Sequence, residues 1–121
     1  ALSSEVITVN GDGTPLRTYL DQRDLARWLW TLLFEGKAGE AYNVGSDQAI
    51  SISELAYLVR DILAPSKSVL VLNASNSSTE RNRYVPSIIK AQALHGLTIS
   101  IPLANSVAET VRSALDRNAQ L

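Results

Sequence analysis

Residues 11–20 read Gly-Asp-Gly-Thr-Pro-Leu-Arg-Thr-Tyr-Leu, and the interpretation of the whole chain depends on them. The first half has the composition of a tight turn, because glycine, aspartate and proline favour turn conformations. The second half predicts a short strand that carries Arg17 among apolar neighbours. A charged side chain is costly to bury unless something pairs with it. Arg17 therefore either faces solvent or binds an anion.

The segments around this stretch predict a hairpin followed by a strongly apolar helix. Residues 5–9 alternate and are β-branched, which indicates a strand with residues 16–20 as its hairpin partner. Asp21 or Asp24 can cap the following helix, and Gly36 can end it. Its inward stripe is predicted to consist of Leu25, Trp28, Leu29, Leu32 and Leu33. Trp30 and Phe34 lie off this stripe, which is typical of a helix between two layers.

The remainder of the chain continues to alternate strands and helices. A buried strand is predicted at 41–45, a helix begins at the Ser51–Glu54 capping box, and another strand covers 68–72. Residues 73–83 contain no large apolar side chain and predict a mobile or ligand-binding loop. A short helix is expected from Pro86 to Gly96, and a last one from about 102 to 118 with Leu103, Val107, Val111, Ala114 and Leu115 facing inward. We therefore predict one α/β domain over residues 1–121, with about four helices packed on a few short strands.

Composition excludes several classes of protein. A net charge of −1 provides no basic field for nucleic acid. With no cysteine and a single histidine, neither a disulfide framework nor a histidine-rich metal site is expected. The longest apolar run is too short to span a bilayer, and no signal peptide is recognisable. We expect a cytoplasmic protein without metal, nucleic-acid or membrane partners.

No set of residues has the spacing of a catalytic site. The Gly11–Gly13 turn lacks a third glycine and is not followed at once by a helix, so we interpret it as a turn and not a phosphate loop. None of the four tyrosines has a lysine four residues later. His95 lies beside the helix terminator Gly96, where it is expected to interact with terminal carbonyls. We predict no catalytic residue in this chain.

Arg17, Arg81 and Arg83 are the candidate binding residues. Arginine suits bidentate recognition of phosphate. The alternative is that all three are solvated surface side chains, since loop arginines are usually exposed. Spacing alone favours the surface interpretation over the binding one.

An ordered set of short motifs resembles the C-terminal part of the extended short-chain dehydrogenase/reductase family, the NAD-dependent nucleotide-sugar epimerases and dehydratases. Each motif alone is weak, but together they extend from about Val6 to Arg112. The set is Gly11-Asp12-Gly13, Arg17-Thr18-Tyr19-Leu20, Asp24-Leu25-Ala26, Ala41-Tyr42-Asn43-Val44-Gly45-Ser46, Ile50-Ser51-Ile52-Ser53-Glu54-Leu55, Arg83-Tyr84-Val85-Pro86-Ser87, Lys90-Ala91, Leu94 and Gly96-Leu97.

The resemblance implies a substrate-binding region that lacks the Rossmann half of the fold. In such enzymes the Rossmann half holds NAD and carries the Tyr-x-x-x-Lys pair, so the chain alone is expected to have no cofactor and no activity. An arginine after the Gly-Asp-Gly turn and one before Tyr-Val-Pro clamp the diphosphate of a nucleotide sugar. Carried over, these are Arg17 and either Arg81 or Arg83. The segment Asp21-Gln22-Arg23 departs from the family pattern, so Arg23 could alter ligand fit.

Two other functions remain open. One is a truncated, non-enzymatic module whose apolar faces now serve self-association as a homodimer or a higher oligomer. The other is a small anion-binding protein that keeps the arginine pocket without the chemistry. Neither the sugar nor the choice between epimerase and dehydratase can be read from the sequence.

Overall fold

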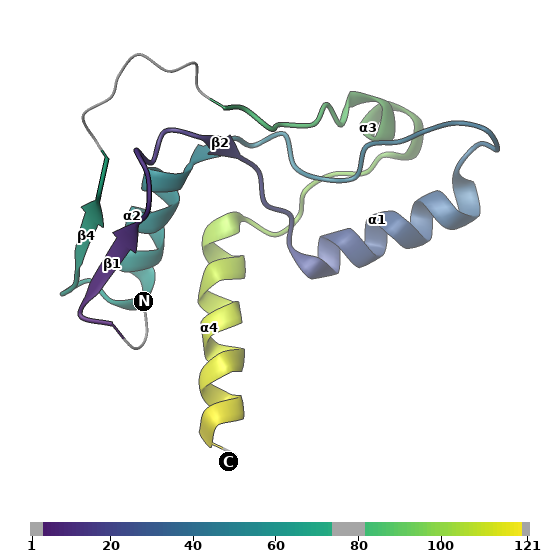
Figure 1. The fold of residues 1–121 in the computed structure, drawn as a ribbon. Helices are drawn as coiled ribbons and strands as arrows, with labels where there is room; N and C mark the ends of the chain where they lie inside the picture. Colours follow the sequence, from purple (N-terminus) through teal and green to yellow (C-terminus); the bar gives the residue numbers. More distant parts are fainter. Residues whose placement is uncertain (1–3, 74–81, 120–121) are drawn as a thin grey trace.

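The computed structural model describes residues 4–73 and 82–119, which form an α/β fold of four helices and four short strands (Figure 1). The predicted fold class is confirmed. The elements are β1 (Val6–Val9), β2 (Leu16–Arg17), α1 (Gln22–Glu35), β3 (Ile50–Ser51), α2 (Ile52–Leu63), β4 (Ser68–Val71), α3 (Ile89–His95) and α4 (Leu103–Ala119). In Figure 1, β1, β4 and α2 form one group of elements, α1 and α3 form a second, and α4 extends from between them.

The predicted hairpin between the first two strands is wrong. β1 pairs in parallel with β4, with Val6 opposite Ser68 and Val9 opposite Val71. β2 is confined to two residues and pairs antiparallel with β3 instead. The reason is that α2 packs against both β1 and β4, so a crossover through this helix buries the apolar strands better than a local turn would.

The turn after β1 directs the chain onto the start of α2. Asp12 accepts hydrogen bonds from the Thr14 backbone N–H at 3.0 Å and the Thr14 hydroxyl at 2.8 Å. These two bonds lower the pKa of the Asp12 carboxyl. Gly13 follows in the left-handed conformation at φ 71°, and its carbonyl accepts from the Ser53 N–H at 3.0 Å. The turn is thus a docking point between two segments about forty residues apart in sequence.

Gly13→Ala is expected to destabilise the fold by roughly 1–3 kcal/mol, since strain at a special backbone position costs about that much. An added Cβ would meet the Ser53 Cβ at 2.8 Å, in a backbone conformation that disfavours side chains. Gly11→Ala is the matched control, because a Cβ there meets nothing within 4 Å. Urea unfolding of both variants tests this expectation, and equal midpoints for the two would contradict it.

The capping box at the start of α2 is confirmed. Ser51 Oγ accepts from the Glu54 N–H at 3.2 Å, while the Glu54 carboxylate accepts from the Ser51 N–H at 2.8 Å. With this end fixed, α2 lies between the β1–β4 pair and α4. The helix thereby joins the small sheet to the C-terminal helix.

α1 is capped as predicted but buries a narrower face than predicted. Asp21 is its N-cap, and the Gly36 N–H closes its last turn on the Leu32 carbonyl at 2.9 Å. Trp28 is fully buried, in a cluster with Ile88, Ala91 and Leu97 against which Leu32, Val44 and Ile99 pack. The expectation that Leu25, Leu29 and Leu33 face inward is wrong, as their exposed fractions are 39%, 52% and 70%. Among residues 4–73 and 82–119, other elements cover α1 on one side only.

Asp24 is a buried anchor and not a cap. Its carboxylate accepts from the backbone N–H groups of Ser100 and Ile101, both at 2.9 Å, and from Arg27 at 3.0 Å. Burial raises the pKa of Asp24, but the hydrogen bonds from Ser100, Ile101 and Arg27 outweigh it and hold the pKa below its ordinary value. A charged carboxylate therefore ties α1 to the segment that leads into α4.

Three further predictions need correction. Residues 41–45 are not a strand, because no neighbouring segment within the described residues forms a ladder with them, and Ala41 and Asn43 are exposed. Pro86 does not open α3, which begins three residues later; the proline instead packs against Gly45. Leu115 of α4 is 51% exposed and does not face inward. Most of the 73–83 loop lies outside the described residues.

Candidate anion-binding site

β2 is the centre of the candidate site because it has a neighbour on each side. One neighbour is β3, where Ile50 lies opposite Arg17. The other is the segment at residues 82–84, which runs parallel to β2. There the Leu16 N–H donates to the Asn82 carbonyl at 2.9 Å, and the Tyr84 N–H donates to the Leu16 carbonyl at 3.1 Å. Segments far apart in sequence thus bring Arg17 next to the end of the polar loop.

The Arg17 guanidinium is held by one nitrogen. Nη1 donates to the Leu16 carbonyl at 2.8 Å, to the Asn82 carbonyl at 3.2 Å and to Asn82 Oδ1 at 3.3 Å. A guanidinium has five N–H donors. Within residues 4–73 and 82–119, no contact engages Nε or Nη2 of Arg17. The group is therefore oriented and still has donors for a ligand.

Charge pairing separates Arg17 and Arg83 from the other arginines. The side chains of the four others that the structure describes each lie next to a carboxylate: Arg23, Arg27, Arg60 and Arg112. Among the described side chains, neither Arg17 nor Arg83 has such a partner. Unpaired cations close to one another favour an anion. Arg81, the third candidate, lies outside the described residues.

Arg17 and Arg83 belong to opposite faces of the paired strands. Side chains alternate along an extended segment. Because Leu16 forms a parallel bridge with Arg83, Arg17 shares its face with Asn82 and Tyr84. The side-chain hydrogen bond between Arg17 and Asn82 agrees with this assignment. A ligand on the Arg17 face meets Arg83 only if that side chain reaches around its own strand.

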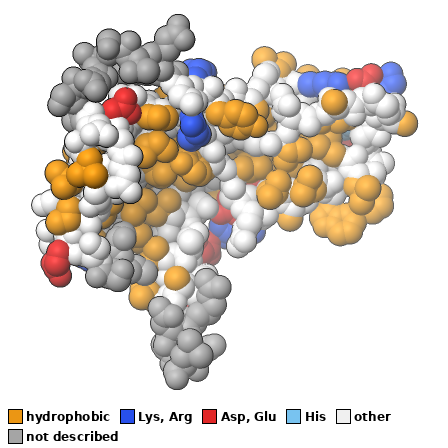
Figure 2. All heavy atoms as spheres, viewed as in Figure 1, with side chains coloured by type: hydrophobic (Ala, Val, Ile, Leu, Met, Phe, Trp, Pro, Cys, Tyr) orange, Lys and Arg blue, Asp and Glu red, His pale blue; other side chains and the backbone are white. Residues whose placement is uncertain are grey.

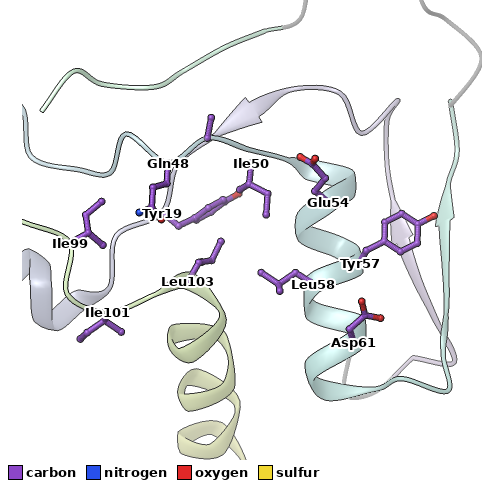
Figure 3. Close-up of a pocket in the computed structure, with 11 residues that line it drawn as sticks. Tyr19, Gln48, Ile50, Glu54, Tyr57, Leu58, Asp61, Ile99, Ile101 and Leu103 are labelled. Carbon is purple, nitrogen blue, oxygen red and sulfur yellow. The ribbon is translucent and has the colours of Figure 1, made fainter.

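A ligand-sized cavity of about 570 Å³ lies between β3, α2 and the start of α4. Tyr19 from the segment after β2, Ile50 from β3, Leu58 from α2 and Leu103 from α4 converge on it (Figure 3). Gln48, Glu54 and Asp61 add polar groups to the lining. Ile50, the residue opposite Arg17, thus also borders the cavity.

The glycine turn offers no phosphate cradle. The first N–H groups of α2 are engaged inside the chain, because Ile52 donates to the Pro15 carbonyl at 3.1 Å and Ser53 donates to the Gly13 carbonyl at 3.0 Å. A pyrophosphate requires free N–H groups at a helix start. The residues present here do not fit NAD in that manner, and the expectation that this chain holds no cofactor stays a prediction.

Arg23 is engaged away from the candidate site. Its side chain bonds Asp21 at 2.9 Å and Glu109 of α4 at 2.5 Å. The hydrogen bonds from the Arg23 side chain and backbone hold the pKa of Asp21 well below its usual range. This departure from the family pattern therefore serves to join α1 to α4.

The remaining residue singled out in the sequence is His95. The Nε2 atom of His95 is buried without a hydrogen-bond partner, and its ring meets Tyr42 edge-on at 5.0 Å, so no bond from this atom to a terminal carbonyl is seen.

Over residues 4–73 and 82–119, no helix is long and apolar enough to cross a membrane. The same residues contain no group of three or more acidic or histidine side chains placed to hold a metal ion.

Sequence reasoning missed Asn82 and the cavity. Asn82 looked like one more polar residue of the loop, and only its position beside β2 makes it the support of Arg17. The cavity is lined by side chains from four separate segments, and a local sequence pattern cannot predict that these segments meet.

Comparisons with known proteins bear first on the fold and then on the family that the chain resembles. The structure of RMD from Pseudomonas aeruginosa complexed with NADPH matches with a TM-score of 0.79 and 27% identity, over 96% of this chain and 38% of that one. UDP-glucose 4-epimerase from Thermotoga maritima, solved with UDP-glucose, matches in fold with a TM-score of 0.74 at 19% identity, over 91% of this chain and 36% of that one. The fold is therefore that of part of an extended short-chain dehydrogenase/reductase enzyme.

Residues 1–45 match the NAD dependent epimerase/dehydratase family. A dTDP-glucose 4,6-dehydratase of Escherichia coli is 28% identical over 123 residues, which include 99% of this chain and 33% of that protein. The chain thus resembles members of the NAD-dependent epimerase/dehydratase family, as its motifs predicted, and it spans about a third of the length of this curated relative.

Proposed function

We propose that residues 1–121 are the substrate-binding region of an NAD-dependent epimerase/dehydratase, and that Arg17 binds the diphosphate of a nucleotide sugar. The observation that carries this proposal is the Arg17 guanidinium, which is oriented by Asn82 and lacks a carboxylate partner among the described residues. Arg83 and Arg81 would add charge from the adjoining segment. The cavity bordered by Ile50 lies beside this site and is large enough for a small ligand.

The relatives support the ligand class. One is a dTDP-glucose 4,6-dehydratase, and one structural neighbour was solved with UDP-glucose. These two ligands share a nucleoside diphosphate, which is the part that an arginine fork recognises. The base and the sugar stay open for this chain.

Under this proposal the 121 residues bind substrate without carrying out the reaction. They contain neither a Gly-x-x-Gly-x-x-Gly loop nor a Tyr-x-x-x-Lys pair. Oxidation of the sugar by NAD would need both elements. The rival function, an anion-binding module without a sugar, predicts that pyrophosphate binds as tightly as a nucleotide sugar.

Arg17→Ala should weaken UDP or dTDP binding about ten- to a hundredfold, because one charge-assisted partner contributes about 1.5–3 kcal/mol. Calorimetry on the 121-residue chain measures this change, with Arg112→Ala as the matched control, because Arg112 is paired with Glu109 on α4. Arg83→Ala should give a smaller loss, since its side chain starts from the opposite face. NAD should show no saturable binding.

Two results would contradict the proposal. An unchanged UDP affinity in Arg17→Ala would remove this arginine from the site. Absence of any nucleotide binding by the unmodified chain would favour the oligomerising module.

A further inference from the structure

Tyr84 lies directly beside Arg17 on the same face of the paired strands. The bridge pairs Leu16 with Arg83, and extending that parallel register by one residue pairs Arg17 with Tyr84. The Tyr84 N–H bond to the Leu16 carbonyl fixes its backbone there. Neighbouring strands are about 4.8 Å apart, so the tyrosine ring begins within reach of whatever the guanidinium binds.

Tyr84 is the most exposed of the four tyrosines. Tyr42 lies between Lys90 and His95, Tyr57 lies under Arg60, and Tyr19 borders the cavity. Tyr84 is 72% exposed, and no described side chain stacks on it. An aromatic ring with an open face beside an unpaired cation is suited to stack a planar group attached to a phosphate.

A third residue lies beside Arg17, on the side away from Tyr84. Ile50 lies opposite Arg17 in β3 and borders the cavity. Across three adjacent segments the order is therefore an exposed aromatic ring, an oriented cation and an apolar cavity wall. This order corresponds to the base, diphosphate and sugar of a nucleotide sugar.

We propose that Tyr84 stacks the nucleobase of the ligand whose diphosphate binds Arg17. This inference rests on the proposed function and adds to it a residue for the base end of the ligand. Because every base has an aromatic face, the stacking selects for a nucleoside and not for one base over another.

Two probes separate the base from the diphosphate: UDP, which carries both, and inorganic pyrophosphate, which lacks the base. Tyr84→Ala should weaken UDP binding about tenfold while pyrophosphate binding stays unchanged. Tyr84→Phe should keep UDP affinity within twofold, since the ring and not the hydroxyl makes the contact. Phe34→Ala is the matched control, because Phe34 is a similarly exposed aromatic side chain (76%) on α1 that does not line the cavity, and it should leave both affinities unchanged.

The outcomes distinguish this inference from the proposed function. If the unmodified chain binds UDP and Tyr84→Ala binds it equally well, the stacking is refuted while the role of Arg17 survives. An equal loss for UDP and pyrophosphate in Tyr84→Ala would also refute it, because the residue would then only support the strand. If the unmodified chain binds neither ligand, both proposals are overturned.

Discussion

Trp28→Ala is expected to lower the free energy of unfolding by about 3–5 kcal/mol, the usual loss for a buried aromatic side chain. Trp28 has no exposed surface and packs against Ile88, Ala91 and Leu97. Its indole N–H also donates to the Thr98 carbonyl at 3.2 Å. The substitution would remove both the packing and this bond, in a domain whose total stability is typically about 5–15 kcal/mol.

Trp30→Ala is the matched control on the same helix, two residues along. Trp30 is 61% exposed and stacks on Phe34 with ring centroids 5.5 Å apart. We expect its replacement to change the free energy of unfolding by less than about 1 kcal/mol, as for most surface substitutions. Urea unfolding followed by circular dichroism compares the two variants at one protein concentration. Similar losses would show that the cluster around Trp28 is not the core of this chain.

The second large effect expected is self-association through α1. Hydrophobic side chains gather over this helix (Figure 2). Five of them share a face that nothing described covers: Leu25, Leu29, Trp30, Leu33 and Phe34, with exposed fractions from 39% to 76%. Three charged side chains near the start of the helix, Arg23, Asp24 and Arg27, are engaged in ion pairs within the chain. This face is therefore apolar and suits a second copy of itself.

An area estimate indicates a weak but specific dimer. Five side chains at roughly half exposure present on the order of 500 Å², judged from the 150–250 Å² that an aromatic side chain buries. Two such faces approach the roughly 1,000 Å² needed for a specific interface. If about 600 Å² of this surface is apolar, burial contributes on the order of 15 kcal/mol against association costs of about 4–15 kcal/mol. A two-fold dimer with micromolar affinity is the simplest closed arrangement.

Light scattering across the micromolar range tests the dimer. The unmodified chain should exceed its monomer mass of 13.1 kDa, and the double variant Leu33→Gln, Phe34→Ser should require at least tenfold higher concentration to associate. Leu94→Ser is the control, because Leu94 is 62% exposed on α3 and outside this face. A clean monomer at every concentration would rule out self-association.

The sequence by itself determined four of the helix ends. The Ser51–Glu54 capping box, the Asp21 cap and the Gly36 and Gly96 terminators appear where they were predicted. Each of these features depends on bonds between residues at most four positions apart, so the local sequence contains all of their partners. The amphipathic pattern likewise predicted four helices.

The tertiary structure alone decided which strands pair, which side of α1 is covered and where Arg17 lies. α1 carries apolar side chains on several sides, so its sequence is compatible with more than one buried face. Contact with α3 and the segment around Leu97 determines that the face of Trp28 is the buried one. β1 could have paired with any apolar strand, and the crossover through α2 selected β4. The orientation of the Arg17 guanidinium was decided by Asn82, sixty-five residues away, whose carbonyl accepts a hydrogen bond from it. These outcomes depend on the free energy of contacts between residues far apart in the sequence. A local sequence pattern does not contain the distant partner, so it cannot predict such a contact.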